Sequence, residues 1–210
     1  WADPFFSRRI GLVEGQEVPI DFGARLGGQV GEYELGLYQV RTGDTSLDNG
    51  DGTVRPWGAE DFTVARVKRR LFQQSHLGMI YTRRASDIAP GSVELEDRHT
   101  VGADFNFFTS QFLGKYNAQF EGFMLYHNDP LEGGDSSSSD RSSRGVRWSF
   151  PNDLIRVHSS HREFGEQWDP ALGFVERRGY RRHQPTFTIA PRPQNWKYIR
   201  QTEHEIYFEY

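Results

Sequence analysis

Two neighbouring segments decide the fold class of this chain: "HTVGADFNFF" (residues 99–108) and "KYNAQFEGFMLY" (residues 115–126). In both, apolar and polar side chains alternate. The apolar set is Val101, Ala103, Phe105 and Phe107 in the first segment, and Tyr116, Ala118, Phe120, Met124 and Tyr126 in the second. A period of two places successive side chains on opposite faces of a β-strand. The two segments are therefore predicted to form an antiparallel hairpin with one apolar and one polar face.

The same alternation recurs along the chain. It predicts four further strand pairs: residues 24–42 with a tight turn at Gly31, 62–71 with 75–83, 144–150 with 153–164, and 185–190 with 199–210. Pro185 and Pro191 weaken the prediction for the ninth strand, because proline donates no ladder hydrogen bond. No segment of eleven or more residues has helical apolar spacing. About ten strands are therefore predicted, and no long helix.

The connections between these strands alternate in length. They are short within each pair and long between pairs, where loops are predicted near residues 43–60, 84–97, 127–143 and 165–181. Transmembrane barrels have short periplasmic turns and longer extracellular loops, and their strands are about 9 to 11 residues long. We therefore expect one domain over residues 1–210, an all-β antiparallel up-and-down meander that forms an outer-membrane-type β-barrel or a large part of one.

Aromatic residues support that expectation. Those near strand ends on the apolar side are Tyr33, Tyr81, Phe107, Tyr116, Tyr126 and Tyr210. In a barrel they would form the girdles at the two membrane interfaces. Aromatic strand ends also occur in other β proteins. A soluble β-sandwich that binds carbohydrate through exposed aromatic residues such as Trp57, Trp148 and Trp168 therefore remains the alternative.

Composition excludes several classes of protein. The chain has 210 residues, with 25 Lys and Arg against 29 Asp and Glu, so its net charge of -4 argues against nucleic-acid binding. It has no cysteine, which excludes disulfides and thiolate chemistry. No run of about 18 apolar residues would form a membrane-spanning helix. Because the chain starts at Trp1 without a leader, we expect an excerpt or a processed product.

The basic segment "FTVARVKRRLFQQ" (residues 62–74) is amphipathic with the period of a strand. Arg66, Lys68 and Arg70 share one face, and Arg69 is the only charge on the other, where it can reach the aqueous boundary. The segment is thus predicted to be a lumen-facing basic column rather than a nucleic-acid site. The polar residues predicted to face the lumen are Arg66, Lys68, Arg70, Asn117, Gln119, Glu121, Glu203 and Glu205.

The loops supply a second set of candidates. Trp57, Trp168, Arg177 and Arg178 are candidates for binding saccharides or the phosphates of lipopolysaccharide at the outer rim. The alternative is that the arginines are only solvated rim or lumen charges.

Other motifs favour structural explanations. "SLDNGDGTV" (residues 46–54) places glycines where a calcium loop needs oxygen ligands, so an exposed turn is expected. On a strand, the spacing of His158 and His161 sends the two rings to opposite faces, which argues against a metal site. The serines at 136–139 indicate a hydrated loop. We expect no catalytic residue, metal or cofactor. A hydrolase with two carboxylates across a sugar stays a further alternative.

Several blocks in order resemble a known family. "FFSRRIG" (5–11), "VPIDFGARLGGQVGEYELGLYQVRTG" (18–43), "FTVARVKRRL" (62–71), "LGMIYTRR" (77–84), "VGADFNF" (101–107) and "DPALGFVERRGYRR" (169–182) are similar to domain of unknown function 5916. That region follows a family-nine-like carbohydrate-binding module, which is absent here. The resemblance implies an outer-membrane barrel of Gram-negative bacteria, porin-like and associated with saccharide or nutrient binding or passage, with the lipid bilayer as partner. It also implies that the barrel continues beyond "EIYFEY" (205–210).

Overall fold

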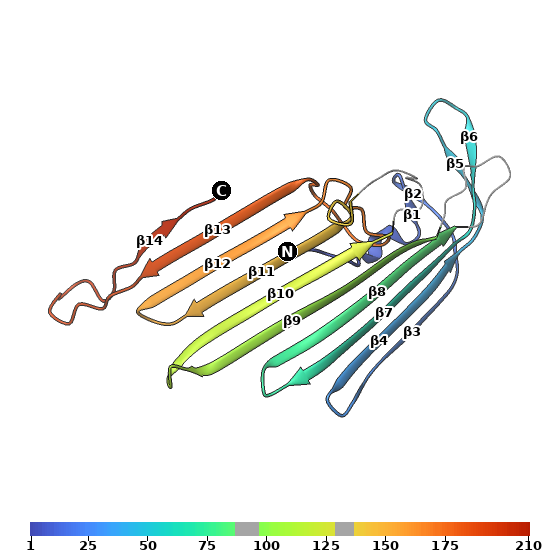
Figure 1. Cartoon of the computed structure of the whole chain (residues 1–210). Helices are drawn as coiled ribbons and strands as arrows, with labels where there is room; N and C mark the ends of the chain where they lie inside the picture. The colour runs from blue at the N-terminus through green and yellow to red at the C-terminus, as the bar shows by residue number, and fades with distance from the viewer. Residues whose placement is uncertain (87–96, 129–136) are drawn as a thin grey trace.

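The computed structural model describes residues 1–86, 97–128 and 137–210, and its main element is one antiparallel sheet of ten strands (Figure 1). The strands are β3 (Ile20–Val30), β4 (Tyr33–Thr42), β7 (Glu60–Leu71), β8 (Ser75–Ser86), β9 (Arg98–Phe112), β10 (Tyr116–His127), β11 (Ser142–Pro151), β12 (Ile155–Phe164), β13 (Tyr180–Ile189) and β14 (His204–Tyr207). They follow one another as a meander from β3 to β14. The predicted all-β meander is confirmed.

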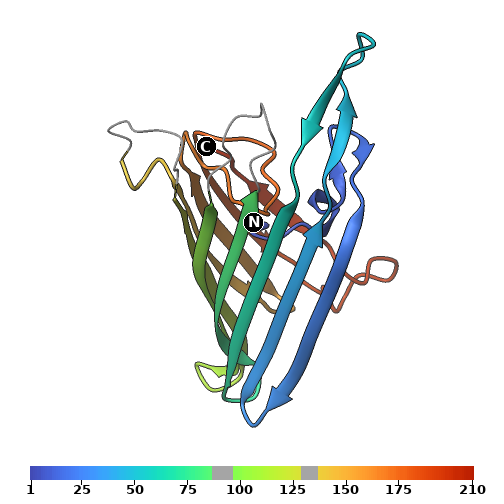
Figure 2. The ribbon, with the colours of Figure 1, turned by 90° about the vertical axis from the view of Figure 1, so that its right-hand side faces the viewer.

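Three small elements complete the described part of the chain. The strands β1 (Leu12–Val13) and β2 (Gln16–Glu17) form one two-stranded sheet, and β5 (Thr45–Asp48) and β6 (Val54–Trp57) form another. The β5–β6 hairpin projects beyond the main sheet at the end where the long connections lie (Figures 1 and 2). A single 3-10 turn, η1 (Ser7–Arg9), is the only helix among the described residues.

The first four predicted strand pairs are confirmed, and the fifth differs in its bounds. Strand β13 begins at Tyr180, five residues before the predicted start, and β14 spans only His204–Tyr207. Pro185 is accommodated because its carbonyl faces the weakly paired β14 side, where it accepts a hydrogen bond from the Phe208 N–H at 3.1 Å. The predicted loop 165–181 therefore ends at residue 179. Residues 87–96 of the predicted loop 84–97 and residues 129–136 of the predicted loop 127–143 lie outside the described residues.

The main sheet is strongly curved and has two free edges (Figure 2). Strand β3 is one edge and β14 the other, and no hydrogen-bonded pairing joins them in the described part of the chain. A soluble β-sandwich would need two sheets packed face to face. Instead, the described residues form one large sheet and two two-stranded ones, which does not fit the sandwich alternative.

The convex face of the sheet is apolar. Leu35, Val67, Met79, Ala103 and Met124 are register partners across five consecutive strands of the sheet and form one apolar row. Further exposed large apolar side chains that share this face are Leu26, Val30, Leu37, Leu77, Val101, Phe107, Phe120, Val146, Trp148 and Phe187.

The concave face is polar near the short turns and buried near the long connections. The N-terminal segment (residues 1–19) and the β12–β13 connection (residues 165–179) lie together over it, joined by isolated bridges from Asp3 to Phe174 and from Phe5 to Leu172. They cover two clusters of buried apolar side chains. One consists of Val40, Phe62, Val64 and Leu172, and the other of Phe123, Leu125, Phe164 and Trp168.

Gly165 allows the β12–β13 connection to start against neighbouring backbone. A Cβ at this position would lie 2.1 Å from the Asp140 carbonyl oxygen and 2.6 Å from that of Ser139. We expect Gly165→Ala to lower the free energy of unfolding by about 1–3 kcal/mol, because backbone cannot rotate away as a side chain can. Thermal unfolding followed by circular dichroism measures the change. Gly28→Ala is the control, since its Cβ would meet nothing within 4 Å. Equal stability of the two variants would contradict this account.

Candidate functional site

Strand alternation brings polar side chains from five strands into one row on the concave face. Arg70, His76, Asn106, Glu121 and Arg147 are register partners along neighbouring strands from β7 to β11. This row lies in the half of the sheet that is nearer the short turns. It is the polar counterpart of the apolar row on the convex face.

An ion pair spans strand β8 next to this polar row, on the side toward the long connections. The Arg66 Nη1 atom of β7 lies 2.5 Å from Asp104 Oδ2 of β9, and His76 Nε2 lies 3.5 Å from Asp104 Oδ1. Gly78 lies between the two strands, and a Cβ there would come within 2.5 Å of Arg66 Nη2 and 2.9 Å of Asp104 Oδ1. The absence of a side chain at Gly78 therefore lets the guanidinium reach across β8.

A second ion pair lies two strands away. Arg147 Nη1 donates to Glu121 Oε1 at 2.8 Å, and Asn106 Nδ2 donates to Glu121 Oε2 at 3.4 Å. The Trp1 ring lies on the Arg147 guanidinium, 4.3 Å from its Cζ, and meets the Phe123 ring edge-on with centroids 4.8 Å apart. The start of the N-terminal segment is thus held against the polar face by a cation–π contact and an aromatic contact.

A partly open cavity of about 370 Å³ lies beside these groups. Trp1, Ala2 and Pro4 of the N-terminal segment lie along one side. The polar residues that line it are Arg66, Lys68, His76, Asp104, Asn106 and Glu121. A volume of this size is within the range of small-molecule sites, and polar groups converging on it are typical of them.

Lys68 differs from the other charges around this cavity. Its register partner on β4 is Glu34, but no ion pair joins the two, and no ion pair involves Lys68 among the described residues. Lys68 and Arg66 also line an adjoining, more open cavity of about 980 Å³ beside β3 and β4. The Lys68 side chain therefore lines both spaces.

The remaining lumen-facing candidates lie away from this cavity. Arg70 donates to the Gly31 carbonyl at 3.2 Å, near the short turn. Glu203 pairs with Arg156 at 2.5 Å, and Glu205 accepts from Thr188 at 3.3 Å, both close to the β14 edge. Gln119 lies on β10 beside Ser149 of β11.

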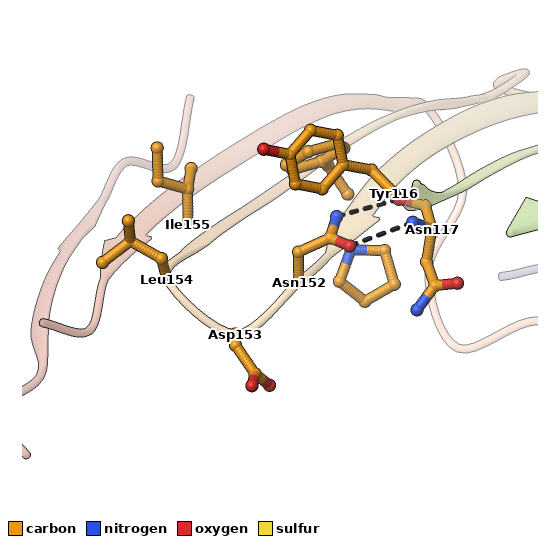
Figure 3. A pocket seen from close by; sticks show the side chains of 8 residues that line it. Tyr116, Asn117, Asn152, Asp153, Leu154 and Ile155 are labelled. Atoms are coloured by element: carbon orange, nitrogen blue, oxygen red, sulfur yellow. Dashed lines mark hydrogen bonds between the residues drawn. The ribbon is translucent and has the colours of Figure 1, made fainter. Parts of the chain in front are cut away.

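Asn117 is held at the short-turn end of the sheet by the β11–β12 turn. Its backbone N–H and carbonyl form two hydrogen bonds with the side-chain amide of Asn152, both 2.9 Å long (Figure 3). Beside them is a largely apolar cavity of about 540 Å³, lined by Tyr116, Leu154 and Ile155 among others. Asn117 thus helps to fix a turn, and it does not line the polar cavity.

Of the candidate binding residues in the loops, Trp168 does not lie where the sequence predicts. Trp168 was predicted to be an exposed binding residue, but its side chain is only 1 % exposed and packs in the cluster with Phe123 and Leu125. A tryptophan in a long loop is buried here because the loop folds back over the sheet. Trp57 stacks near Arg55 in the β5–β6 hairpin, with Arg55 Cζ 5.3 Å from its ring centroid. Arg177 lies 5.6 Å from the Tyr180 ring.

Arg178 belongs to a cluster around Asp169 that joins three parts of the chain. Arg98 of β9 donates to the Asp169 carboxylate and to its backbone carbonyl, both at 2.8 Å. Arg178 of the same connection lies 3.1 Å from this carboxylate, and Arg9 of the N-terminal segment lies 4.0 Å from it. Burial alone raises the pKa of Asp169, but the three guanidiniums outweigh it and the net effect lowers the pKa.

Two sequence motifs take structural roles. In "SLDNGDGTV", Asp48 Oδ1 accepts from the Gly50 N–H at 2.7 Å, and Asp51 Oδ1 from the Thr53 N–H at 2.9 Å, as in an ordinary exposed turn. His158 faces the concave side, where it contacts Ser149 at 3.0 Å, and His161 faces the convex side next to His183. Residue 136 of the serine run lies outside the described residues.

Sequence reasoning missed Asp104, His76, Arg147 and Asp169 as members of a site. The alternation already placed Asp104 and His76 on the polar side of their strands, so that pattern could have found them. Asp169 lies in a loop, where no periodicity indicates what a side chain will contact.

No family model matches the chain, and no curated protein or solved structure is similar to it. Within the described ranges, no helix is long and apolar enough to cross a membrane. The assignment of function therefore depends on the distribution of side chains over the sheet.

The Asp169 cluster leads to a prediction about pH. A carboxylate whose pKa is lowered by folding stabilises the folded state above its unfolded pKa of about 3.9, and this contribution is lost as pH falls through the folded value. We expect Asp169→Asn to lower the free energy of unfolding by about 1–3 kcal/mol at neutral pH. The variant should also lack this part of the stability loss in acid. Thermal unfolding measured from neutral pH downward tests both expectations.

Asp153→Asn is the matched control. Asp153 is largely exposed and pairs with Arg192 at 3.5 Å in a turn, so its removal should change stability by less than about 1 kcal/mol. If Asp169→Asn unfolds at the same temperature as the wild type, the Asp169 cluster does not hold the N-terminal segment and the β12–β13 connection against the sheet.

Proposed function

We propose that this chain forms the wall of a bacterial outer-membrane β-barrel whose polar lumen binds small hydrophilic nutrients or lets them pass. The single observation that carries the proposal is the polarity of the two faces. From β3 to β11 the convex face exposes a broad apolar surface, whereas the concave face carries the Arg66–Asp104 and Arg147–Glu121 ion pairs and the polar cavity. A sheet of a soluble protein normally buries its apolar face and exposes its polar one.

The borders of the apolar surface also fit a bilayer. Toward the long connections, the convex face changes to ion pairs: Arg41 with Asp61, Arg83 with Asp97, and Glu163 with both Arg144 and Arg181. Toward the short turns lie Arg69, which pairs with Glu32 at 3.5 Å, and the Tyr33 ring beside it. Charges and aromatic rings at both limits of an apolar band are typical of transmembrane barrels.

The free edges favour a sheet that continues. Strand β3 is eleven residues long, exposed throughout, and carries the apolar side chains Phe22, Leu26 and Val30. Such an edge leaves unpaired backbone groups, which a bilayer does not tolerate. This agrees with the resemblance to domain of unknown function 5916, which implies further strands. The proposed saccharide or nutrient ligands, the lipopolysaccharide contacts of Arg177 and Arg178, and the outer-membrane location rest on that resemblance.

Two other functions remain to be distinguished by experiment. A detergent-free, saccharide-binding module would bind glycans through exposed aromatic residues such as Trp57. A hydrolase would use two carboxylates, and Asp104 and Glu121 line the same cavity. However, each of these carboxylates is paired with an arginine, which favours a lining role over proton transfer.

Solubility tests the proposal directly. We expect the refolded chain to be monodisperse in detergent micelles and to aggregate when detergent is removed, because the convex apolar face then meets water. Size-exclusion chromatography with and without detergent measures this. A monodisperse, folded chain in plain buffer would rule the barrel out.

A charge on the convex face gives a second test. Met79 is 68 % exposed in the middle of the apolar row. We expect Met79→Arg to lower the free energy of unfolding in phospholipid vesicles by about 2–4 kcal/mol, the cost of a cation facing lipid near the midplane. Urea titration followed by tryptophan fluorescence measures it.

Two controls accompany this variant. Gln119→Arg places the same charge on the concave face and should cost much less, and Met79→Leu preserves the apolar surface. If both arginine variants are destabilised equally in vesicles, the convex face does not contact lipid.

A further inference from the structure

The strongest unassigned feature of the concave face is the cavity of about 370 Å³ between the N-terminal segment and strands β7 to β10. Its acidic and basic side chains differ in whether they have ion-pair partners. Both carboxylates that line it are engaged by arginines, Asp104 by Arg66 and Glu121 by Arg147. Lys68, in contrast, has no carboxylate partner within ion-pair distance among the described residues. Among the side chains that line the cavity, Lys68 thus offers a ligand a cation without a carboxylate partner.

The guanidinium beside Lys68 is positioned for the same ligand. Arg66 is held across Gly78 by Asp104, so that its orientation is fixed before anything binds. Arginine has five N–H donors, and the Asp104 pair leaves some of them free for the cavity. Two cations at one side of a small cavity, one of them pre-oriented, form a recognition site for a carboxylate.

The cavity also offers hydrogen-bond acceptors, from Asp104 beside Arg66 and from Glu121 and Asn106 further along the polar row. Glu121 and Asp104 each retain lone pairs beyond their arginine contacts, and the Asn106 amide can both donate and accept. Hydroxyl groups are the donors that suit such acceptors without adding charge. Trp1, Ala2 and Pro4 provide an apolar side against which C–H groups of a ring can pack.

We infer that this cavity binds a polyhydroxylated carboxylate of the size of one sugar acid, with its carboxylate at Lys68 and Arg66 and its hydroxyls at Glu121, Asp104 and Asn106. A neutral sugar would leave the Lys68 ammonium uncompensated, and a simple carboxylate would leave the acceptors unused. The inference rests on the proposed function, in which the concave face lines a lumen that small hydrophilic molecules enter.

Calorimetric titration of the protein in detergent micelles tests the inference. The probes are D-glucuronate, D-glucose as the neutral analogue, and acetate as the carboxylate without hydroxyls. We expect glucuronate to bind at least about tenfold more tightly than either of the others, since only glucuronate uses both the cations and the acceptors of the cavity. Acetate binding as tightly as glucuronate would reduce the site to general anion attraction and overturn the inference.

Substitution of Lys68 locates the site. Lys68→Met should weaken glucuronate binding by about tenfold, and Lys68→Arg should retain most of it, because the charge is kept. Lys115→Met is the matched control, because Lys115 lies in the exposed β9–β10 turn outside the cavity. Unchanged glucuronate affinity in a folded Lys68→Met protein would overturn the inference.

The two proposals fail in different ways. A chain that needs detergent but does not bind glucuronate leaves the barrel standing and removes the sugar-acid site. A chain that binds glucuronate while folded and monodisperse in plain buffer keeps the site and removes the barrel.

Discussion

The register of hydrogen bonding between neighbouring strands is the constraint on which the rest of this structure depends. Each strand alternates between apolar and polar side chains, and the ladders align these alternations. Leu35, Val67, Met79, Ala103 and Met124 therefore form one apolar row on the convex face. The polar row from Arg70 to Arg147 lies on the opposite face. A slip of one residue in any ladder would exchange the faces of that strand and break both rows.

The chemistry of the concave face depends on this alignment and on small residues within it. Arg66 and Asp104 belong to strands that are not hydrogen-bonded to each other, and they meet only because Gly78 leaves the space above β8 open. In ion pairs of this kind, the positive and negative charges of different strands compensate each other across the sheet. Lys68 lies outside these pairs and lines the same cavity.

The N-terminal segment and the β12–β13 connection, which cover the concave face, are held by contacts of a different kind from those within the sheet. Buried Trp168 and Leu172 anchor the β12–β13 connection by apolar contact, and Asp169 joins that connection to β9 and to the N-terminal segment. None of these contacts has a period along the sequence. Loop side chains can point in any direction, so the burial of Trp168 and the arginine cluster around Asp169 were beyond sequence reasoning. The exposed position predicted for Trp168 was wrong for this reason.

The sequence by itself determined the all-β class, the first four hairpins and the face on which Arg66, Lys68 and Glu121 lie, because alternation within a strand is a local property with a fixed period. It also indicated that His158 and His161 point to opposite faces. Only the tertiary structure decided which of these polar residues meet, that Asp104 pairs with Arg66 while Lys68 has no ion-pair partner among the described residues, and that two distant segments cover the same face. Such contacts depend on curvature, on register across several strands and on the path of loops, and none of these is encoded in a local pattern.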